Sequence, residues 1–246
     1  MIKFKLIAAV ENLAYIGYTD DRGKSRLPTF PMWDMQKVVE QTKNAVVLIG
    51  ERTLRSIPNG LDTRGIQLLV LASRNTNHGE LKQEYPHIIE VFSNLDEIKE
   101  YCQENVSHYP TNTNFVCLGG GVLYDYIISN NMVNVYDLTI KFDPKDTLSK
   151  LPHTRLVTSA EIMGKVEYFL GLFDMMADVE VQKTFSHEYN IINLKRMKDL
   201  TLLLSNRNVV YLDLQVVVGE MSLDFTKVRL FKVDELICEN YHGFPN

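Results

Sequence analysis

The chain has 246 residues, of which 45% are hydrophobic, so it can bury a full core as one large domain or as one ordinary domain with an appendage. Its 26 Lys and Arg residues against 31 Asp and Glu residues give a formal net charge of -5, which favours no nucleic-acid partner. Three scattered cysteines and six histidines without metal-ligand spacing predict a reducing compartment and no metal site.

Hydrophobic patterning predicts alternating strands and helices over the first 142 residues. The apolar run at the N-terminus stops at Glu11, too short for a signal peptide or a membrane span, so we expect a cytoplasmic protein with no membrane partner. Strands are expected at 2–10, 44–50, 66–73, 88–92, 113–119 and 134–142. Helices are expected at 34–43, 51–57, 95–105 and 121–130. The loop at 15–31 is of a length that is more often functional than idle. This alternation predicts an α/β fold with a central, mostly parallel sheet flanked by helices.

The pattern changes toward the C-terminus, where an antiparallel β end to the same sheet is expected. One strand pair is predicted from 178–187 and 189–197, and a second from 207–221 and 226–233, turning around Gly219. We therefore expect a main domain over residues 1–198 and an appended β-rich element of unknown role over residues 199–246. Whether this element makes the chain a homo-oligomer or leaves it a monomer stays open.

Three consecutive glycines, Gly119, Gly120 and Gly121, separate a predicted strand from a predicted helix. A plain turn needs one glycine or two, whereas three favour the close approach of a ligand to bare backbone. In open α/β sheets ligands lie at the carboxyl ends of the strands, where this turn is placed. The spacing is not that of a Rossmann fingerprint, so we expect a ligand turn of another kind.

Asp34 opens a predicted helix and has two interpretations. It could cap the helix, which the local sequence favours, or it could be a buried carboxylate that serves proton transfer. Arg64 is by default a loop arginine that could pair with a carboxylate ligand, and Thr139 by default alternates within a strand. Arg52 and Thr53 follow Gly50 at another turn from strand to helix, where a phosphate would lie.

Taken in order, several stretches resemble dihydrofolate reductase: "LIAAV", "IG", "LP", the helix led by Asp34, "VVLIGERTLRSI", the arginine before a strand, "VLASR", "LGGGVLY", "LT" and "DT". The resemblance covers residues 2–147 and more loosely extends to residue 197. It implies NADPH-dependent reduction of 7,8-dihydrofolate to tetrahydrofolate, a step of one-carbon metabolism, with dihydrofolate and NADPH as the ligands.

The resemblance also implies roles for individual residues. Asp34 would hold the pterin and assist protonation of N5, Thr139 would be linked to Asp34, and Arg64 would grip the glutamate tail. The substrate pocket would further contain Ile7, Ala8, Leu27, Met35, Val38, Ile57, Leu61, Leu118 and Tyr124. The cofactor would be held by Ala9, Ile16, Gly17, Gly50, Arg52, Thr53, Leu71, Ser73, Arg74, Gly119, Gly120, Gly121, Val122, Leu123, Tyr124 and Thr147. Ser73 and Arg74 would meet the adenosine 2′-phosphate, two of the glycines would share a cis peptide bond, and residues 17–27 would form a lid.

The chain departs from the family's pattern at a few positions. Thr29 stands where tryptophan is common, Trp33 precedes the aspartate, and Val38 replaces a usual aromatic residue, which predicts altered antifolate affinity. Glu51 occupies a position that is often basic. Two other functions are weighed against the folate reading: a pyrimidine reductase of riboflavin synthesis with the same fold, and a catalytically silent nucleotide-binding or assembly protein.

Overall fold

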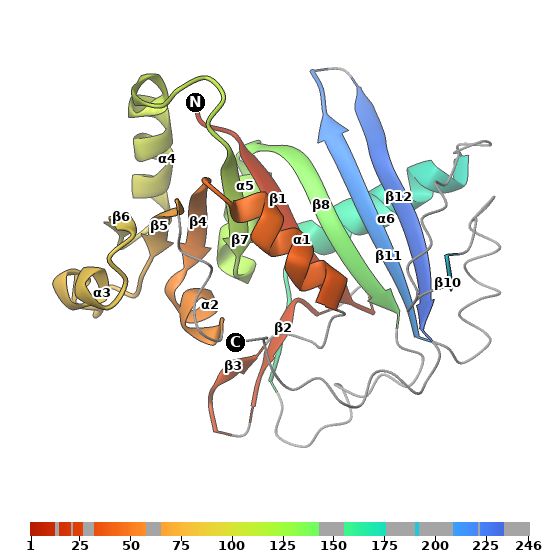
Figure 1. Ribbon diagram of the computed structural model, residues 1–246, viewed down its shortest axis with the longest axis horizontal. Helices are drawn as coiled ribbons and strands as arrows, with labels where there is room; N and C mark the ends of the chain where they lie inside the picture. Colours follow the sequence, from red (N-terminus) through yellow and green to blue (C-terminus); the bar gives the residue numbers. More distant parts are fainter. Residues whose placement is uncertain are drawn as a thin grey trace. The chain divides into compact units, whose positions relative to one another are not determined.

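The computed structural model describes residues 1–12, 15–20, 22–26, 32–57, 65–142, 155–175, 190–191, 209–220 and 222–233, which are the coloured parts of Figure 1. The chain divides into two compact units. The first contains Met1–Ile7 and Met32–Tyr136, and the second contains Ala8–Pro31 and Asp137–Asn246. The domain boundary expected between residues 198 and 199 lies outside the described residues.

The first unit is an open sheet that follows the predicted strands. The strands β1 (Phe4–Glu11), β4 (Val46–Gly50), β5 (Gln67–Leu71), β6 (Ile88–Phe92) and β7 (Phe115–Gly119) lie in the order β1-β7-β4-β5-β6, and each neighbouring pair is parallel (Figure 1). The side chains of β4, β5 and β7 are mostly buried, as in sheets covered on both faces, whereas Ile89 of β6 is exposed. The expected α/β fold with a mostly parallel sheet is therefore confirmed.

The helices of this unit connect the strands. They are α1 (Met32–Thr42), α2 (Glu51–Ser56), α3 (His78–Glu84), α4 (Leu95–Glu104) and α5 (Gly121–Ser129), with a 3₁₀ turn at Val106–His108. The sequence pattern did not predict α3, which has only one buried residue, Leu81. Its N-terminal signal is nevertheless present, because the Asn77 side chain accepts hydrogen bonds from the backbone N–H groups of Gly79 and Glu80.

The buried side of α1 is more polar than its sequence suggests. Met35, Val38 and Val39 are apolar residues at helical spacing, but Val39 is 43% exposed. Polar side chains are buried instead, namely Asp34, Lys37 and Thr42. The Thr42 hydroxyl donates to the backbone oxygen of Val38 at 2.8 Å, which satisfies it within the helix. The buried acid and base are a polar feature of the candidate site described below.

The second unit contains the antiparallel end that was predicted. The strand β8 (Val133–Phe142) enters this unit from the first, and is followed in the sheet by β11 (Val209–Val218), β12 (Leu223–Val233) and β10 (Asn190–Ile191). β11 and β12 are paired antiparallel over their whole length, and Gly219 N donates to Ser222 O at 2.9 Å in the turn between them. The strand expected at 178–187 lies outside the described residues.

Two features of the second unit were not predicted. Part of the expected loop at 15–31 forms β2 (Gly17–Thr19) and β3 (Ser25–Arg26), which make a small sheet with β9 (Arg155–Val157). The helix α6 (Ala160–Met175) begins after Ser159, whose side chain accepts from Ile162 N at 3.2 Å. No helix within the described ranges is long and apolar enough to cross a membrane.

Two buried thiols give a prediction for the first unit. Burial raises the pKa of Cys102 and of Cys117 from 9.0 to about 12. In a Cys238→Ser protein at pH 8 we expect both thiols to react with a disulfide reagent about a hundredfold or more slowly than in the unfolded chain, since the thiolate is the nucleophile. Rapid reaction of a folded sample would contradict the burial.

The same thiols set the sign of a pH effect on stability. Below pH 9 both thiols are protonated in the folded and unfolded chains, so they cause no difference. Between pH 9 and about 12 only the unfolded chain ionises, so the free energy of unfolding falls as the pH rises.

Candidate functional site

The glycine turn lies where β7 ends and α5 begins. Gly119 has φ +79°, and the Gly119–Gly120 peptide bond is cis, as the resemblance implied. A Cβ atom built on Gly119 would overlap the ring of Tyr124, and one on Gly120 would lie 3.1 Å from Thr53 Oγ1. A side chain is therefore excluded at Gly119 by its positive φ and by the Tyr124 ring, and a side chain at Gly120 would press on the Thr53 hydroxyl.

The carboxyl end of the neighbouring strand β4 meets the same turn. A Cβ atom on Gly50 would lie 3.5 Å from both Gly119 O and Gly120 N. Backbone without side chains, from the ends of two adjacent parallel strands, therefore lies beside Thr53. Dinucleotide phosphates require such close contact with backbone at strand ends. No side chain caps α5, because Gly120 occupies its cap position. These residues fit the phosphate-bearing part of a dinucleotide.

Tyr124 connects the turn to the first strand. Its hydroxyl donates a hydrogen bond to the backbone oxygen of Ile7 at 2.7 Å. Burial, together with the Cys117 thiol and the Asp34 carboxylate, raises the pKa of Tyr124 well above its ordinary value. The phenol therefore remains a hydrogen-bond donor at neutral pH.

Asp34 is the third residue of α1, not the residue before the helix, and it is 4% exposed. Its carboxylate lies 3.6 Å from the Lys37 ammonium, and both side chains are buried. The Lys37 ammonium also lies 6.0 Å from the centre of the Trp33 ring, in cation–π range. Sequence reasoning missed Lys37, although its spacing of three residues from Asp34 places both on one side of a helix.

Apolar residues expected near the pterin are brought together in the first unit. Ile7 and Leu118 belong to one buried cluster, against which Val38 and Ile57 pack. Met35 is half-buried on α1. These side chains supply an apolar environment next to the elements that carry Asp34 and Tyr124.

Some of the residues expected in the site belong to the second unit, and others lie outside the described ranges. Ala8, Ile16, Gly17 and Thr139 are buried in the second unit, where Ala9 is half-buried. The expectations for Leu27, Leu61, Arg64 and Thr147 fall outside the described residues.

The expected adenosine end of the site lies after β5. Ser73 and Arg74 are exposed on the turn that follows this strand, and Arg52 is exposed on α2. Leu71 and Thr53 are half-buried, whereas Leu123 is buried and Val122 is 64% exposed on α5. A carboxylate occupies this region, because Glu51 Oε2 accepts hydrogen bonds from Ser73 N at 3.3 Å and from Thr76 Oγ1 at 2.7 Å.

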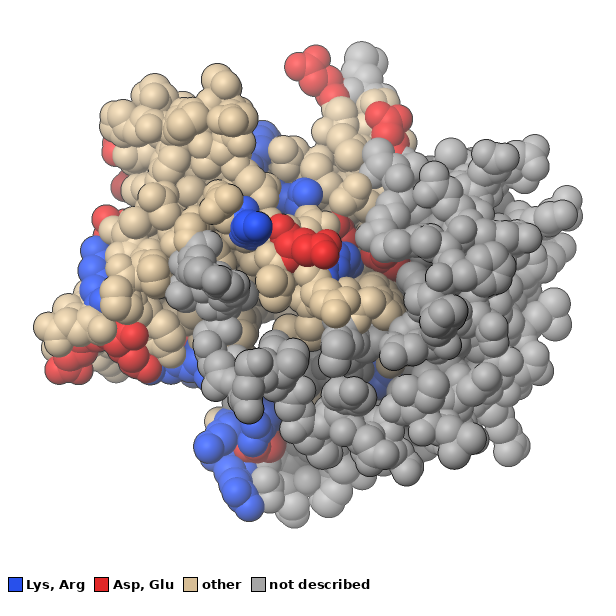
Figure 2. All heavy atoms as spheres, in the orientation of Figure 1, with Lys and Arg blue, Asp and Glu red and all other residues tan. Residues whose placement is uncertain are grey.

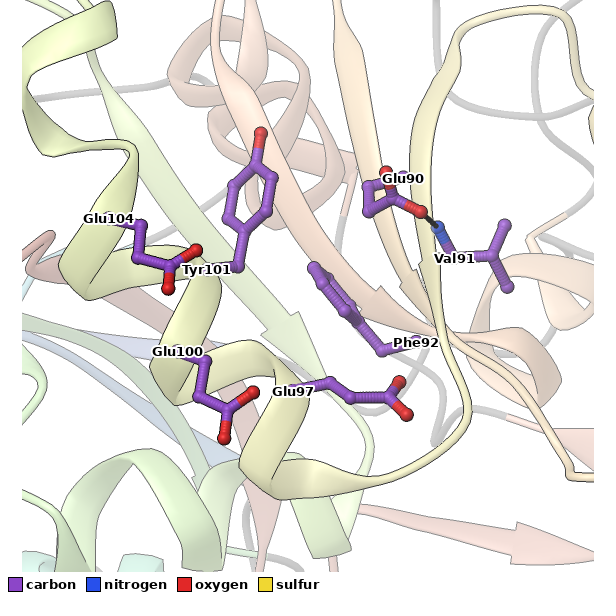
Figure 3. A pocket seen from close by; sticks show the side chains of 7 residues that line it. All are labelled: Glu90, Val91, Phe92, Glu97, Glu100, Tyr101 and Glu104. Atoms are coloured by element: carbon purple, nitrogen blue, oxygen red, sulfur yellow. Dashed lines mark hydrogen bonds between the residues drawn. The ribbon is translucent and has the colours of Figure 1, made fainter.

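A separate hollow of about 310 Å³ lies between β6 and α4. Figure 3 shows four glutamates around it, Glu90, Glu97, Glu100 and Glu104, beside the rings of Phe92 and Tyr101. Its negative charge opposes a phosphate-bearing ligand, so it does not compete with the glycine turn for a dinucleotide. On the face drawn in Figure 2, acidic side chains gather over α3 and basic side chains gather over the tip of β2 and β3.

Within the described part of the chain, no three His, Cys, Asp or Glu residues are grouped so that they could hold a metal ion. No protein-family model matches the chain, and no curated protein matches it. The mixed, mostly parallel sheet fits a dihydrofolate-reductase-like fold.

Proposed function

We propose that this chain reduces 7,8-dihydrofolate to 5,6,7,8-tetrahydrofolate with a reduced nicotinamide dinucleotide, for which the resemblance implies NADPH. One observation carries the proposal: the buried Asp34 carboxylate belongs to the same compact unit as the bare-backbone turn at Gly119, which packs on Tyr124. A single buried acid and a bare-backbone turn at a strand end are the two protein features that this reaction needs in one unit.

In this proposal the two oxygens of Asp34 accept hydrogen bonds from N3 and the 2-amino group of the pterin. Burial makes these charge-assisted hydrogen bonds strong, and Lys37 supplies a counter-charge that keeps an ionised acid tolerable in a buried place. The buried anion favours the protonated N5 imine, so that N5 gains a proton from water and C6 gains a hydride. The dinucleotide, when bound, supplies that hydride.

The glycine turn would position the dinucleotide. The backbone N–H groups at the start of α5 and the Thr53 hydroxyl are donors suited to phosphate oxygens, and no Cβ intervenes at Gly119 or Gly120. The hydrogen bond from the Tyr124 hydroxyl to Ile7 O fixes the position of this turn relative to β1. Positioning of this kind is the protein's main contribution to hydride transfer.

The test is turnover by the purified full chain. We expect stoichiometric loss of the reduced-nicotinamide absorbance when dihydrofolate is added, and no loss with the ribosylamino-pyrimidine substrate of riboflavin synthesis. Activity with the pyrimidine alone would show that the chain is the pyrimidine reductase and not a dihydrofolate reductase. Binding of dinucleotide without turnover of either substrate, in protein that is folded by circular dichroism, would favour the catalytically silent alternative.

A further inference from the structure

Glu51 occupies an unusual place for an acidic residue in a dinucleotide site. It is the first residue of α2, directly after β4, and its side chain reaches the turn that follows the adjacent strand β5. One carboxylate oxygen accepts from Ser73 N and from Thr76 Oγ1, and the other accepts from Arg55 Nε at 3.1 Å. The turn itself is closed by Thr76 N donating to Ser73 O at 2.9 Å.

The contacts of the Glu51 carboxylate occupy a backbone N–H donor that an adenosine 2′-phosphate would need. The resemblance places the adenosine 2′-phosphate at Ser73 and Arg74, yet the Ser73 N–H group is already donated to a carboxylate. A phosphate there would have to displace Glu51 and then lie beside its negative charge. A ribose 2′-hydroxyl can instead donate to the same carboxylate, which is how acidic residues at the corresponding place in other α/β folds recognise NAD.

The nearby cations do not remove this conflict. The Arg55 guanidinium lies between two acids, since it also donates to Glu84 at 2.7 and 2.8 Å. Burial would raise the pKa of Glu51, but hydrogen bonds from Thr76, Arg55 and Ser73 lower it overall, so Glu51 is ionised at neutral pH. Arg52 and Arg74 are exposed side chains, which solvent screens.

We infer that Glu51 selects the ribose 2′-hydroxyl and disfavours a 2′-phosphate, so that this chain binds NADH at least as tightly as NADPH. The inference rests on the proposed function, because it takes the dinucleotide to lie along the ends of β4, β5 and β7. It departs from the NADPH preference that the resemblance implies.

The test is calorimetric binding of NADH, NADPH and the fragment 2′,5′-ADP to the full chain and to two Glu51 variants. The wild-type protein is expected to bind NADH no more weakly than NADPH. Glu51→Arg is expected to shift the ratio of the two dissociation constants about tenfold or more toward NADPH, and to tighten binding of 2′,5′-ADP. Glu51→Gln, which changes the side chain less, is expected to shift the ratio in the same direction.

Glu80→Arg is the matched control, because it makes the same charge reversal on an exposed residue of α3 without touching Ser73 or Thr76. Its ratio is expected to stay at the wild-type value. Tighter wild-type binding of NADPH than of NADH, or a ratio that neither Glu51 variant moves, would overturn the inference while leaving reductase activity intact. If neither dinucleotide binds, both the inference and the proposed function fail.

Discussion

Replacement of Asp34 by asparagine is expected to slow dihydrofolate reduction by about 100-fold or more, the usual contribution of a group that assists proton transfer. Asparagine has nearly the same size, but it carries no charge to favour the protonated pterin. The measurement is the steady-state rate with saturating dihydrofolate and dinucleotide. Asp224→Asn makes the same chemical change on an exposed residue of β12 and is expected to leave the rate unchanged.

The Asp34→Asn protein needs a second variant, because it removes one member of a buried ion pair. Loss of the carboxylate leaves the Lys37 ammonium, 3.6 Å away, without that counter-charge, which can destabilise a fold by about 3 to 5 kcal/mol. Lys37→Met and the double variant Asp34→Asn/Lys37→Met separate stability from chemistry. We expect Lys37→Met to keep measurable turnover and the double variant to lose it. A folded double variant with wild-type turnover would exclude Asp34 from the reaction.

Replacement of Gly119 by alanine is expected to lower the free energy of unfolding by about 2 to 4 kcal/mol. Two causes combine: φ at this residue is +79°, and the added methyl group would overlap the buried ring of Tyr124. The ring cannot easily yield, because its hydroxyl is bonded to Ile7 O. Urea unfolding followed by circular dichroism measures the change.

Gly164→Ala is the matched control for this substitution. Gly164 lies in α6, and a Cβ atom there would meet nothing within 4 Å, so alanine is expected to be neutral or to stabilise by up to about 1 kcal/mol. If Gly119→Ala unfolds at the wild-type urea concentration, the packing of Tyr124 on the turn is not what excludes a side chain from Gly119.

Hydrophobic periodicity was sufficient for the sheet of the first unit. Strands such as β4 and β7 are continuous apolar runs, and this pattern belongs to strands that are buried on both faces. The hairpin of β11 and β12 was predicted from two strand-like runs on either side of Gly219, a local signal as well. The glycine turn was found in the same way, because consecutive glycines between a strand and a helix are a local feature.

Two helices, α3 and α6, were missed. α3 has seven residues and one buried side chain, so its cap residue, Asn77, is its main local signal. α6 contains Gly164 and aromatic residues that lower helix propensity. It nevertheless has a cap residue, Ser159, and buried residues at helical spacing, Ile162, Val166 and Phe169, so its sequence did carry a helix signal.

The sequence by itself determined the strands of the first unit, most of the helices between them and the position of the glycine turn, because each depends on residues that are neighbours along the chain. Only the tertiary structure decided that the Asp34 and Lys37 side chains of α1 are buried as an ion pair, and that the Glu51 carboxylate accepts hydrogen bonds from the turn after β5. The physical reason is that burial and hydrogen-bond partners are set by segments distant in the chain. An acidic residue at a helix start therefore has the same local sequence whether it caps the helix, binds a substrate or discriminates between cofactors.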